Sequence, residues 1–301
     1  MQIAMIGLGR MGANMAQRLL RGGHEVVGFD PAADARTALE QKGAASAASL
    51  EQLVSKLKAP RVIWLMVPAG TITDSTITGL MPLLAAGDSI IDGGNSNYHD
   101  TLRRAAATQK LKINYVDSGT SGGIWGLAEG YSLMIGGDEA VVERLRPIFE
   151  TLAPAPDRGW GRVGAVGSGH FTKMIHNGIE YGLMQAYAEG LSILQHKSEF
   201  NLDLHQIAEI WRYGSVVRSW LLDLTSNALQ KNPTLQGIAP YVADSGEGRW
   251  TVAEAIELDV PAPVITLSLL ERLRSRDSDS FTDKLLSAMR NQFGGHEMKK
   301  E

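Results

Sequence analysis

One stretch of the sequence carries a base, an amide and an acid at helical spacing. Lys173, Asn177 and Glu180 stand at positions i, i+4 and i+7 of an otherwise apolar segment, so in a helix they share one face over about 10 Å. A lysine and a glutamate two turns apart can act on one small molecule, the first removing a proton and the second returning one. A solvated stripe or a spaced ion pair is the ordinary alternative. The apolar residues on the other faces favour the catalytic interpretation, because they indicate a helix that is buried on most sides.

Two glycines interrupt the same apolar segment. Gly178 and Gly182 each cost a helix about 1 kcal/mol relative to alanine. We therefore expect another backbone or a ligand to approach the helix closely at these positions.

A glycine-rich loop near the N-terminus has the spacing of a nucleotide site. Gly7, Gly9 and Gly12 form a GxGxxG motif after the apolar run Gln2–Ile6 and before an amphipathic segment. In that setting the glycines allow a tight turn, the approach of a pyrophosphate and close packing of the helix, whose N-terminus favours the anion. The expected cofactor contacts are Gly7, Leu8, Gly9, Arg10, Met11, Gly12, Asp30, Val67, Pro68 and Asn95.

The type of cofactor depends on Asp30, which ends the second predicted strand. A carboxylate there can accept hydrogen bonds from the adenine ribose hydroxyls and repels a 2'-phosphate, which predicts NAD as the cofactor and NADP as the weaker one. Arg36 leaves room for dual use. The alternatives are a glycine turn that binds nothing and an Asp30 that only caps the turn before Pro31.

The composition excludes several classes of protein. The chain has 301 residues, 44% of them hydrophobic, which allows about two domains with large cores. A net charge of -4 without a basic run predicts no nucleic-acid partner. The absence of cysteine excludes disulfides and thiolate metal sites. The sequence shows no cluster of histidines and carboxylates at ligand spacing, so we expect no metal site. The longest apolar run, Val62–Val67, is too short to span a bilayer, so we expect a cytoplasmic protein with no membrane partner.

The pattern of elements changes near residue 165. Before it, short apolar runs alternate with amphipathic stretches, as in an α/β domain of the Rossmann type with a parallel sheet. Beyond it the periodicity is helical and begins with a long helix over 169–196. We expect a dinucleotide-binding domain over 1–165 and an all-α substrate and dimerisation domain over 166–301. The predicted strands cover 2–6, 25–29, 61–67, 89–91, 114–116 and 132–135, and the predicted helices of the first domain cover 11–21, 50–57, 98–109 and, with Asp138 as N-cap, a run to about 151.

Three segments together resemble the 6-phosphogluconate dehydrogenases, the decarboxylating enzymes of the pentose phosphate pathway. They are the helix around Lys173, the segment 92–96 (Asp-Gly-Gly-Asn-Ser) and the segment 118–123 (Ser-Gly-Thr-Ser-Gly-Gly). The resemblance extends from Gly7 to His296, and the short length together with the sequence Ser-Gly-Gly-Ile-Trp at 121–125 is similar to the compact, NAD-preferring branch. It implies oxidation of 6-phosphogluconate at C3, followed by loss of CO2 to give ribulose 5-phosphate, without a metal.

The resemblance also implies a role for each matching residue. Lys173 matches the general base and Glu180 the general acid. The residues that match the contacts to the sugar carboxylate and hydroxyls are Asn95, Ser121, Gly122, Gly123, His176 and Asn177. Those that match the phosphate-binding residues are Tyr181, Arg249, Thr251 and Arg272. The tail that contains Arg290 and His296 matches a segment that enters the partner subunit's active site, which implies a dimer or a dimer of dimers.

The sequence differs from the longer enzymes at two points and leaves two rival functions open. Position 249 is usually lysine there, and the second helical repeat of those enzymes is absent. Another β-hydroxyacid dehydrogenase, of the 3-hydroxyisobutyrate or tartronate semialdehyde type, would share the glycine loop and Lys173 but would not need Glu180, Tyr181 or the arginines. The other rival is a non-catalytic nucleotide-binding protein on the same fold, against which the presence of both Lys173 and Glu180 argues.

Overall fold

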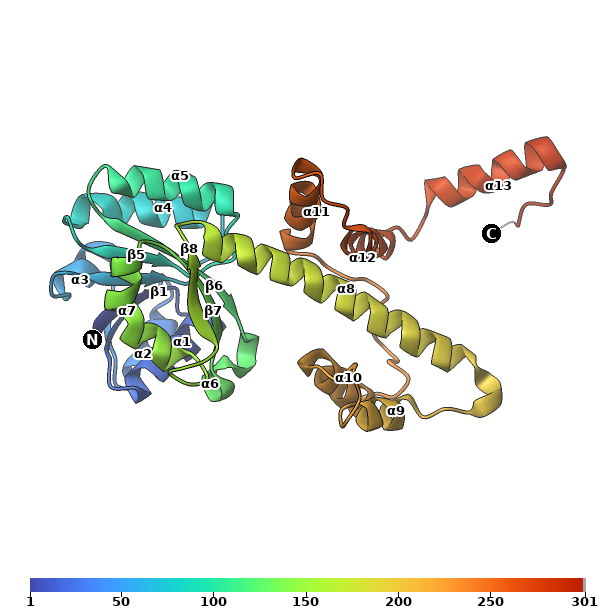
Figure 1. Ribbon diagram of the computed structural model, residues 1–301, viewed down its shortest axis with the longest axis horizontal. Helices are drawn as coiled ribbons and strands as arrows, with labels where there is room; N and C mark the ends of the chain where they lie inside the picture. The colour runs from blue at the N-terminus through green and yellow to red at the C-terminus, as the bar shows by residue number, and fades with distance from the viewer. Residues whose placement is uncertain (300–301) are drawn as a thin grey trace. The chain divides into compact units, whose positions relative to one another are not determined.

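The computed structural model describes residues 1–299, which form two compact units (Figure 1). The first unit is Met1–His176 and the second begins at Asn177. The division falls inside helix α8 (Ser168–His196), whereas the domain boundary expected from the sequence lies near residue 165, just before that helix. The first unit therefore includes the first turns of α8.

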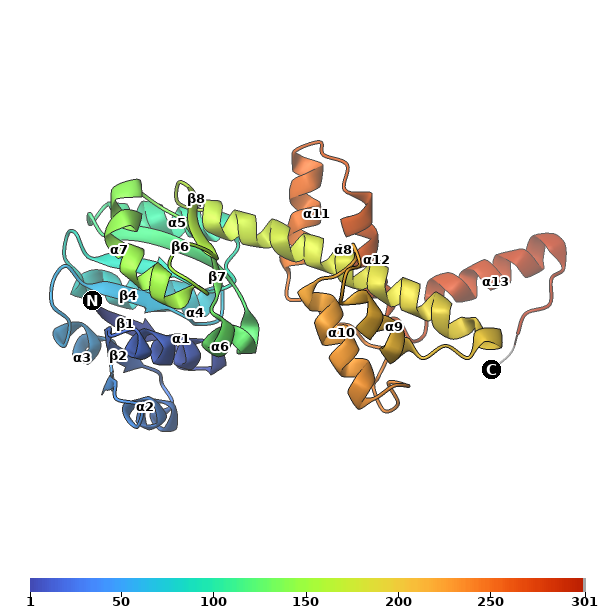
Figure 2. The same cartoon turned by 60° about the horizontal axis from the view of Figure 1, so that its bottom comes forward.

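The first unit is an eight-stranded sheet with helices on both faces (Figure 2). The strand order is β3-β2-β1-β4-β5-β6-β7-β8, and its first six strands are parallel in the order of dinucleotide-binding sheets. The strands are β1 (Gln2–Ile6), β2 (Glu25–Phe29), β3 (Ala45–Ala47), β4 (Val62–Leu65), β5 (Ser89–Asp92), β6 (Asn114–Ser121), β7 (Ser132–Gly136) and β8 (Trp160–Gly164). The helices are α1 (Arg10–Arg21), α2 (Ala33–Glu40), α3 (Leu50–Ser55), α4 (Thr71–Leu80), α5 (Tyr98–Gln109), α6 (Gly126–Glu129) and α7 (Glu139–Leu152), with short 3-10 turns η1 (Met81–Leu83) and η2 (Gly123–Trp125).

The sheet departs from the expected all-parallel arrangement at one edge. β7 runs antiparallel to β6, and β8 then pairs with β7 in parallel. Residues 122–131 connect β6 to β7, which is too short for the crossover that a parallel neighbour needs.

Two strands were not predicted from the sequence. β3 has three residues, and β8 lies in a stretch rich in glycine and proline that was predicted as a connecting region. Both lie at the edges of the sheet and are only partly buried, so neither has a continuous apolar run. The helix over 98–109 is confirmed as α5, and Asp138 caps α7 by accepting the Val141 N–H at 3.1 Å.

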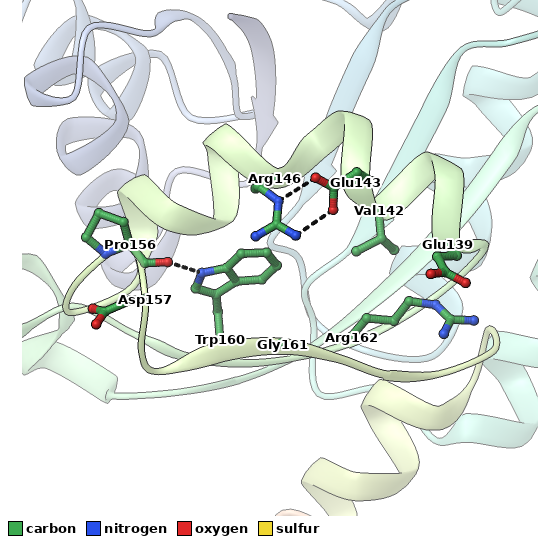
Figure 3. Close-up of a pocket in the computed structure, with 9 residues that line it drawn as sticks. All are labelled: Glu139, Val142, Glu143, Arg146, Pro156, Asp157, Trp160, Gly161 and Arg162. Carbon is green, nitrogen blue, oxygen red and sulfur yellow. Dashed lines mark hydrogen bonds and ion pairs between the residues drawn. The ribbon is translucent and has the colours of Figure 1, made fainter.

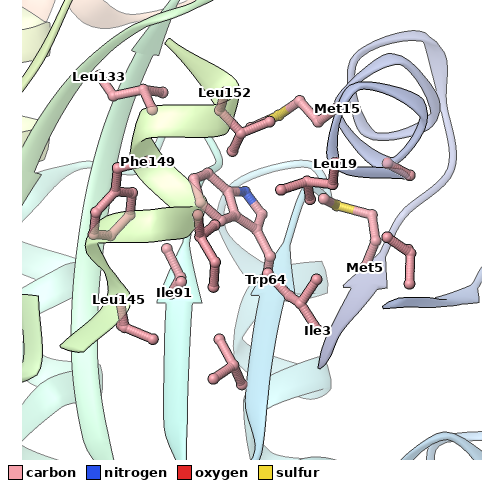
Figure 4. Packing of buried hydrophobic residues seen from close by; sticks show 14 of the residues in the cluster. Ile3, Met5, Met15, Leu19, Trp64, Ile91, Leu133, Leu145, Phe149 and Leu152 are labelled. Carbon is pink, nitrogen blue, oxygen red and sulfur yellow. The ribbon is translucent and has the colours of Figure 1, made fainter. Parts of the chain in front are cut away.

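Apolar side chains fill the space between the sheet and both helical layers. On one face Trp64 of β4 is completely buried and meets Phe149 of α7 edge to face, with 6.2 Å between ring centroids (Figure 4). Met15 and Leu19 of α1 complete this layer. A second cluster on the other face is formed with side chains of α3, α4 and α5. Burial of both faces explains why the central strands read as short apolar runs.

The first turn of α8 lies directly on the backbone of β6 and β7. Asp117 of β6 is completely buried and accepts the N–H groups of Gly167 at 2.6 Å and His170 at 2.8 Å. Gly136 and Gly169 leave room for this contact, because a Cβ at either position would clash with backbone or with Asp117. The start of α8 is therefore held to the sheet by the Asp117 carboxylate, which accepts these two N–H groups, and by close packing at the two glycines.

The second unit is helical, as the sequence predicts. After α8 come α9 (Leu204–Trp211), α10 (Trp220–Lys231), α11 (Glu247–Glu257), α12 (Pro263–Arg274) and α13 (Phe281–Gly294), with a 3-10 turn η3 (Ser198–Phe200). A small core joins Ala208 and Leu222 to Tyr187 of α8. No helix among the described residues has both the length and the hydrophobicity to cross a membrane.

The role of Asp117 can be tested by Asp117→Asn. An amide can accept only one of the two N–H groups and turns its own NH2 toward the other, so we expect a loss of about 2 kcal/mol in the stability of the first unit. Hydrogen exchange of the Gly167 and His170 amides should become faster. Asp138→Asn is the matched control, because asparagine caps a helix as well as aspartate does. Unchanged exchange at both amides would contradict the assignment.

Candidate active site

The glycine loop has the geometry that a pyrophosphate requires. Gly7 has a φ of +88°, and a Cβ at Gly7 or Gly12 would clash with neighbouring backbone. Gly9, in contrast, is exposed and a Cβ there would meet nothing within 4 Å. No side chain caps α1, which begins at Arg10. The open space at Gly9 and the uncapped helix end fit an approaching phosphate group.

Asp30 links the end of β2 to this loop. Its Oδ2 accepts the Leu8 N–H at 2.8 Å, and its Oδ1 accepts the Ala32 N–H at 2.9 Å. Asp30 therefore does cap the turn before Pro31, as the alternative interpretation expects. A carboxylate has about four acceptor sites, so two remain for ribose hydroxyls. Arg36 donates to the carbonyls of Asp30 at 2.7 Å and Pro31 at 3.0 Å, which places a guanidinium beside the same turn.

The loop after β5 presents Asn95 at the carboxyl edge of the sheet. Asn95 is exposed between two buried residues, Gly94 and Ser96. The loop is held by Asp92, whose carboxylate accepts the Gly94 N–H at 3.2 Å, the Ser96 hydroxyl at 3.0 Å and the Tyr115 hydroxyl at 2.9 Å. Burial and the charge of Asp92 raise the pKa of Tyr115 well above its usual value, so the phenol stays protonated and donates. Val67 and Pro68 follow the neighbouring strand β4 at the same edge.

Lys173 is buried on the first turns of α8. Its side chain is 7% exposed, and its Nζ lies 3.3 Å from Nδ1 of His176. Gly119 of β6 faces it, since a Cβ at Gly119 would lie 2.5 Å from the Cβ of Lys173. The structure thus brings two of the predicted residues, Lys173 and His176, together in the first unit and places Lys173 against β6.

The chain leaves β6 at Ser121 through two glycines in unusual conformations. Gly122 has a φ of +129° and Gly123 a φ of +51°, values that side chains rarely adopt. Glycine is therefore required at both positions for the chain to turn out of β6 into η2.

Three of the four predicted phosphate-binding residues meet in the second unit. The guanidinium carbon of Arg272 lies 3.5 Å from the centroid of the Tyr181 ring. Helix α11 packs on α8 at Gly178, where a Cβ would lie 2.7 Å from Cγ2 of Thr251. The close neighbour is a side chain, not the backbone or ligand expected there, and at Gly182 it is the side chain of Val264 at 3.3 Å. Gly248 of α11 lies against the Tyr181 ring. Tyr181, Thr251 and Arg272 thus form one cluster from α8, α11 and α12.

Arg249, the fourth predicted phosphate residue, is engaged with a carboxylate. Its Nε and Nη2 lie 3.1 and 3.2 Å from the two oxygens of Asp244, which also binds Arg276 at 2.6 Å. The hydrogen bond from Arg249 is the largest cause that lowers the pKa of Asp244, so this carboxyl stays ionised near neutral pH. Asp244 was not among the residues predicted from the sequence.

Asn177 and Glu180 belong to the second unit, and α8 is continuous through both. Their spacing from Lys173 is therefore that of one helix face, as predicted. Arg290 lies on α13, and His296 follows it, its carbonyl accepting a hydrogen bond from Asn291 at 2.9 Å.

A surface hollow of about 420 Å³ lies elsewhere on the first unit, between α7 and β8 (Figure 3). Arg146 stacks over Trp160 at 5.0 Å inside it and pairs with Glu143. None of the residues predicted to act on a substrate lines this hollow.

The chain is similar to known proteins over its whole length. Residues 2–167 match the NAD binding domain of 6-phosphogluconate dehydrogenase, and residues 169–284 match the C-terminal domain of the same enzyme. A NAD(+)-dependent, decarboxylating 6-phosphogluconate dehydrogenase from Haloferax volcanii is 45% identical over 99% of this chain and 98% of its own.

Two solved structures are similar to this one. The structure of Plasmodium falciparum 6-phosphogluconate dehydrogenase, described with NADP+ and with 6-phosphogluconate, matches with a TM-score of 0.83 and 26% identity, and this chain covers 66% of its length. A 3-hydroxyisobutyrate dehydrogenase from Mycobacterium tuberculosis matches with a TM-score of 0.75 at 23% identity, over 92% of this chain and 94% of its own. The latter likeness shows the fold alone.

Asp30→Ala tests the cofactor site. Without the carboxylate, NAD loses an acceptor for its ribose hydroxyls and NADP loses a repulsive partner. We therefore expect NAD to bind more weakly and the preference for NAD over NADP to shrink, measured as dissociation constants by titration of intrinsic fluorescence. Asp34→Ala on the following helix α2 is the control and should leave both constants unchanged. Tighter binding of NADP than of NAD by the native protein would contradict this role of Asp30.

Proposed function

Because the chain belongs to the 6-phosphogluconate dehydrogenase family, we propose that it oxidises and decarboxylates 6-phosphogluconate with NAD. The observation that carries this proposal is a buried lysine on the family's helix, placed against a glycine of β6 in a unit that also has the nucleotide loop. The products are ribulose 5-phosphate and CO2. The reaction places the protein in the pentose phosphate pathway and in gluconate use, in the cytoplasm, where these sugar phosphates and the cofactor occur.

Lys173 serves as the general base. NAD held at the glycine loop would supply the acceptor for the hydride from C3, and the neutral amine of Lys173 removes the proton of the C3 hydroxyl. Lys173 is buried, so the amine is withdrawn from bulk water. The resulting ammonium then polarises the C3 carbonyl, so that the carbanion left by departing CO2 becomes an enediol. His176, whose Nδ1 lies 3.3 Å from the amine, contacts the carboxylate or hydroxyls of the sugar acid.

Glu180 completes the reaction by protonating C1 of the enediol. It lies on the same face of α8 as Lys173, and Asn177 stands between them. Asn95, Ser121, Gly122 and Gly123 supply contacts to the carboxylate and hydroxyls of the sugar acid.

The cluster in the second unit supports a phosphorylated substrate. Arg272 is stacked on Tyr181 and donates to the carbonyl of Ala243 at 2.9 Å, and its planar guanidinium is the group best suited to a phosphate. Thr251 adds a hydroxyl, which donates to the carbonyl of Glu247 at 2.8 Å. Arg249 shares its donors with Asp244, so a bound phosphate would compete with that carboxylate for them. The 3-hydroxyisobutyrate and tartronate semialdehyde alternatives have no need of this cluster and are not favoured. A non-catalytic role is likewise disfavoured by the paired acid and base.

The active protein is a dimer or a dimer of dimers in which the tail completes a neighbouring site. Helix α13 supports this proposal, because Phe281, Leu285 and Met289 recur at four-residue spacing on it and are all exposed in the single chain. An apolar stripe of this kind is suited to contact with a second copy. Arg290 and His296 lie at the end of this helix and would be carried with it.

The reaction and its two groups can be tested together. The native protein should reduce NAD in the presence of 6-phosphogluconate, and Lys173→Met should abolish this activity. Glu180→Gln should slow turnover by about 10²-fold or more while leaving substrate binding largely intact, because it removes the proton donor of the last step. Glu189→Gln, farther along α8, is the control. Near-native turnover by Lys173→Met would exclude the mechanism.

The contribution of the tail can be tested by mixing Lys173→Met with His296→Ala, each inactive alone. In a two-fold dimer whose sites combine one body with the other tail, a mixed dimer has one intact site. Random pairing should therefore restore about a quarter of the native activity after joint refolding. If mixed dimers form without any recovery, the tail serves its own subunit.

A further inference from the structure

One buried arginine joins the two loops at the carboxyl ends of β4 and β5. Arg104, on the inner face of α5, has a side chain that is 2% exposed. On the β4 side, its Nε donates to Asp74 Oδ1 at 2.7 Å and its Nη2 to the carbonyl of Gly70 at 3.2 Å. On the β5 side, its Nη1 donates to the hydroxyl of Ser96 at 2.9 Å and to Asp92 Oδ2 at 3.3 Å. A single guanidinium thus bridges both loops.

The bridged loops are those assigned to the cofactor and to the substrate. Pro68 precedes Gly70 in the first loop, and its carbonyl accepts a hydrogen bond from Thr73 at 2.9 Å, at the start of α4. Asn95 immediately precedes Ser96 in the second loop. Arg104 does not itself bond to Pro68 or Asn95. A shift of Arg104 would nevertheless move the two loops that contain them relative to each other.

The chemistry of the cluster explains why an arginine is needed. The guanidinium donates to four acceptors at once, two on each loop side, whereas a lysine ammonium of the same charge could not reach both loops. Burial would lower the pKa of Arg104, but its hydrogen bond to Asp74 and the charge of Asp92 outweigh burial and raise the pKa, so the group stays charged. Because a buried charge with partners in fixed places tolerates little movement, the two loops are held at one separation.

We propose that Arg104 is a positioning residue for hydride transfer, which sets the distance between the nicotinamide held by the Val67–Pro68 loop and the substrate carbon held by Asn95. The inference rests on the proposed function. A misplacement of about 1 Å between reacting groups can lower a rate by about 10²-fold, so small loop shifts should be visible in the kinetics.

The experiment compares Arg104→Met and Arg104→Lys with Arg103→Met. Arg103 is the neighbouring residue of the same charge, but its side chain is 57% exposed and binds Asp74 and Asp100 at the surface. For the Arg104 variants we expect kcat/KM to fall by about tenfold or more, with lysine intermediate, while Arg103→Met stays within about twofold. The deuterium isotope effect with substrate labelled at C3 should rise in the Arg104 variants, because hydride transfer becomes more rate-limiting.

The isotope effect separates positioning from a loss of folded protein. A purely structural role would lower the amount of active enzyme and leave the isotope effect and KM unchanged. Should the Arg104 variants fail to fold, Ser96→Ala removes the hydroxyl that accepts from Arg104 and donates to Asp92, but removes no charge, and it should raise the isotope effect as well. Folded Arg104→Lys and Ser96→Ala proteins with native kcat/KM and isotope effect would overturn the inference. A native protein that binds NAD but does not oxidise 6-phosphogluconate would instead refute the proposed function, and this inference with it.

Discussion

The contact between the first turn of α8 and strands β6 and β7 is the constraint on which the active site depends. Backbone packs against backbone there, with glycine where a Cβ would clash, and a buried carboxylate accepts one N–H just before the helix and one in its first turn. Because Lys173 stands on the second turn of this helix, its position relative to the sheet follows from that contact. A helix docked through long side chains would leave the lysine a wider range of positions.

Two buried aspartates on neighbouring strands organise the carboxyl edge of the sheet. Asp92 of β5 and Asp117 of β6 are paired in register, and both are almost completely removed from water. Each carboxylate is satisfied by different donors. Asp92 accepts hydrogen bonds from the loop that contains Asn95, and Asp117 accepts hydrogen bonds from the start of the helix that contains Lys173. The register of one strand pair thus places a candidate substrate residue and the candidate base at the same edge.

The helical unit follows a different principle. Its side-chain cluster around Tyr181 is formed by close helix contacts at Gly178, which Thr251 approaches, and at Gly248, while Arg272 stacks on the Tyr181 ring. Other parts of the unit leave large apolar side chains exposed, including the stripe on α13. An apolar helix face that its own chain does not cover gains stability when a second copy covers it.

Features with a local signal could be read from the sequence alone. The glycine motif, the central apolar strands, the helix α5 and the spacing of Lys173, Asn177 and Glu180 depend on residues close together in the chain, where steric limits and helical periodicity act directly. The edge strands β3 and β8 were not predicted, because strands that are only partly buried have no continuous apolar run. The antiparallel course of β7, the link of Asp117 to α8, the engagement of Arg249 by Asp244 and the bridge made by Arg104 were decided by the tertiary structure. Asp117 and His170 are 53 residues apart, and Arg104 and Asp74 are 30 apart. A hydrogen bond over such a separation exists only after folding has brought both partners together, so no local pattern of residue types specifies it.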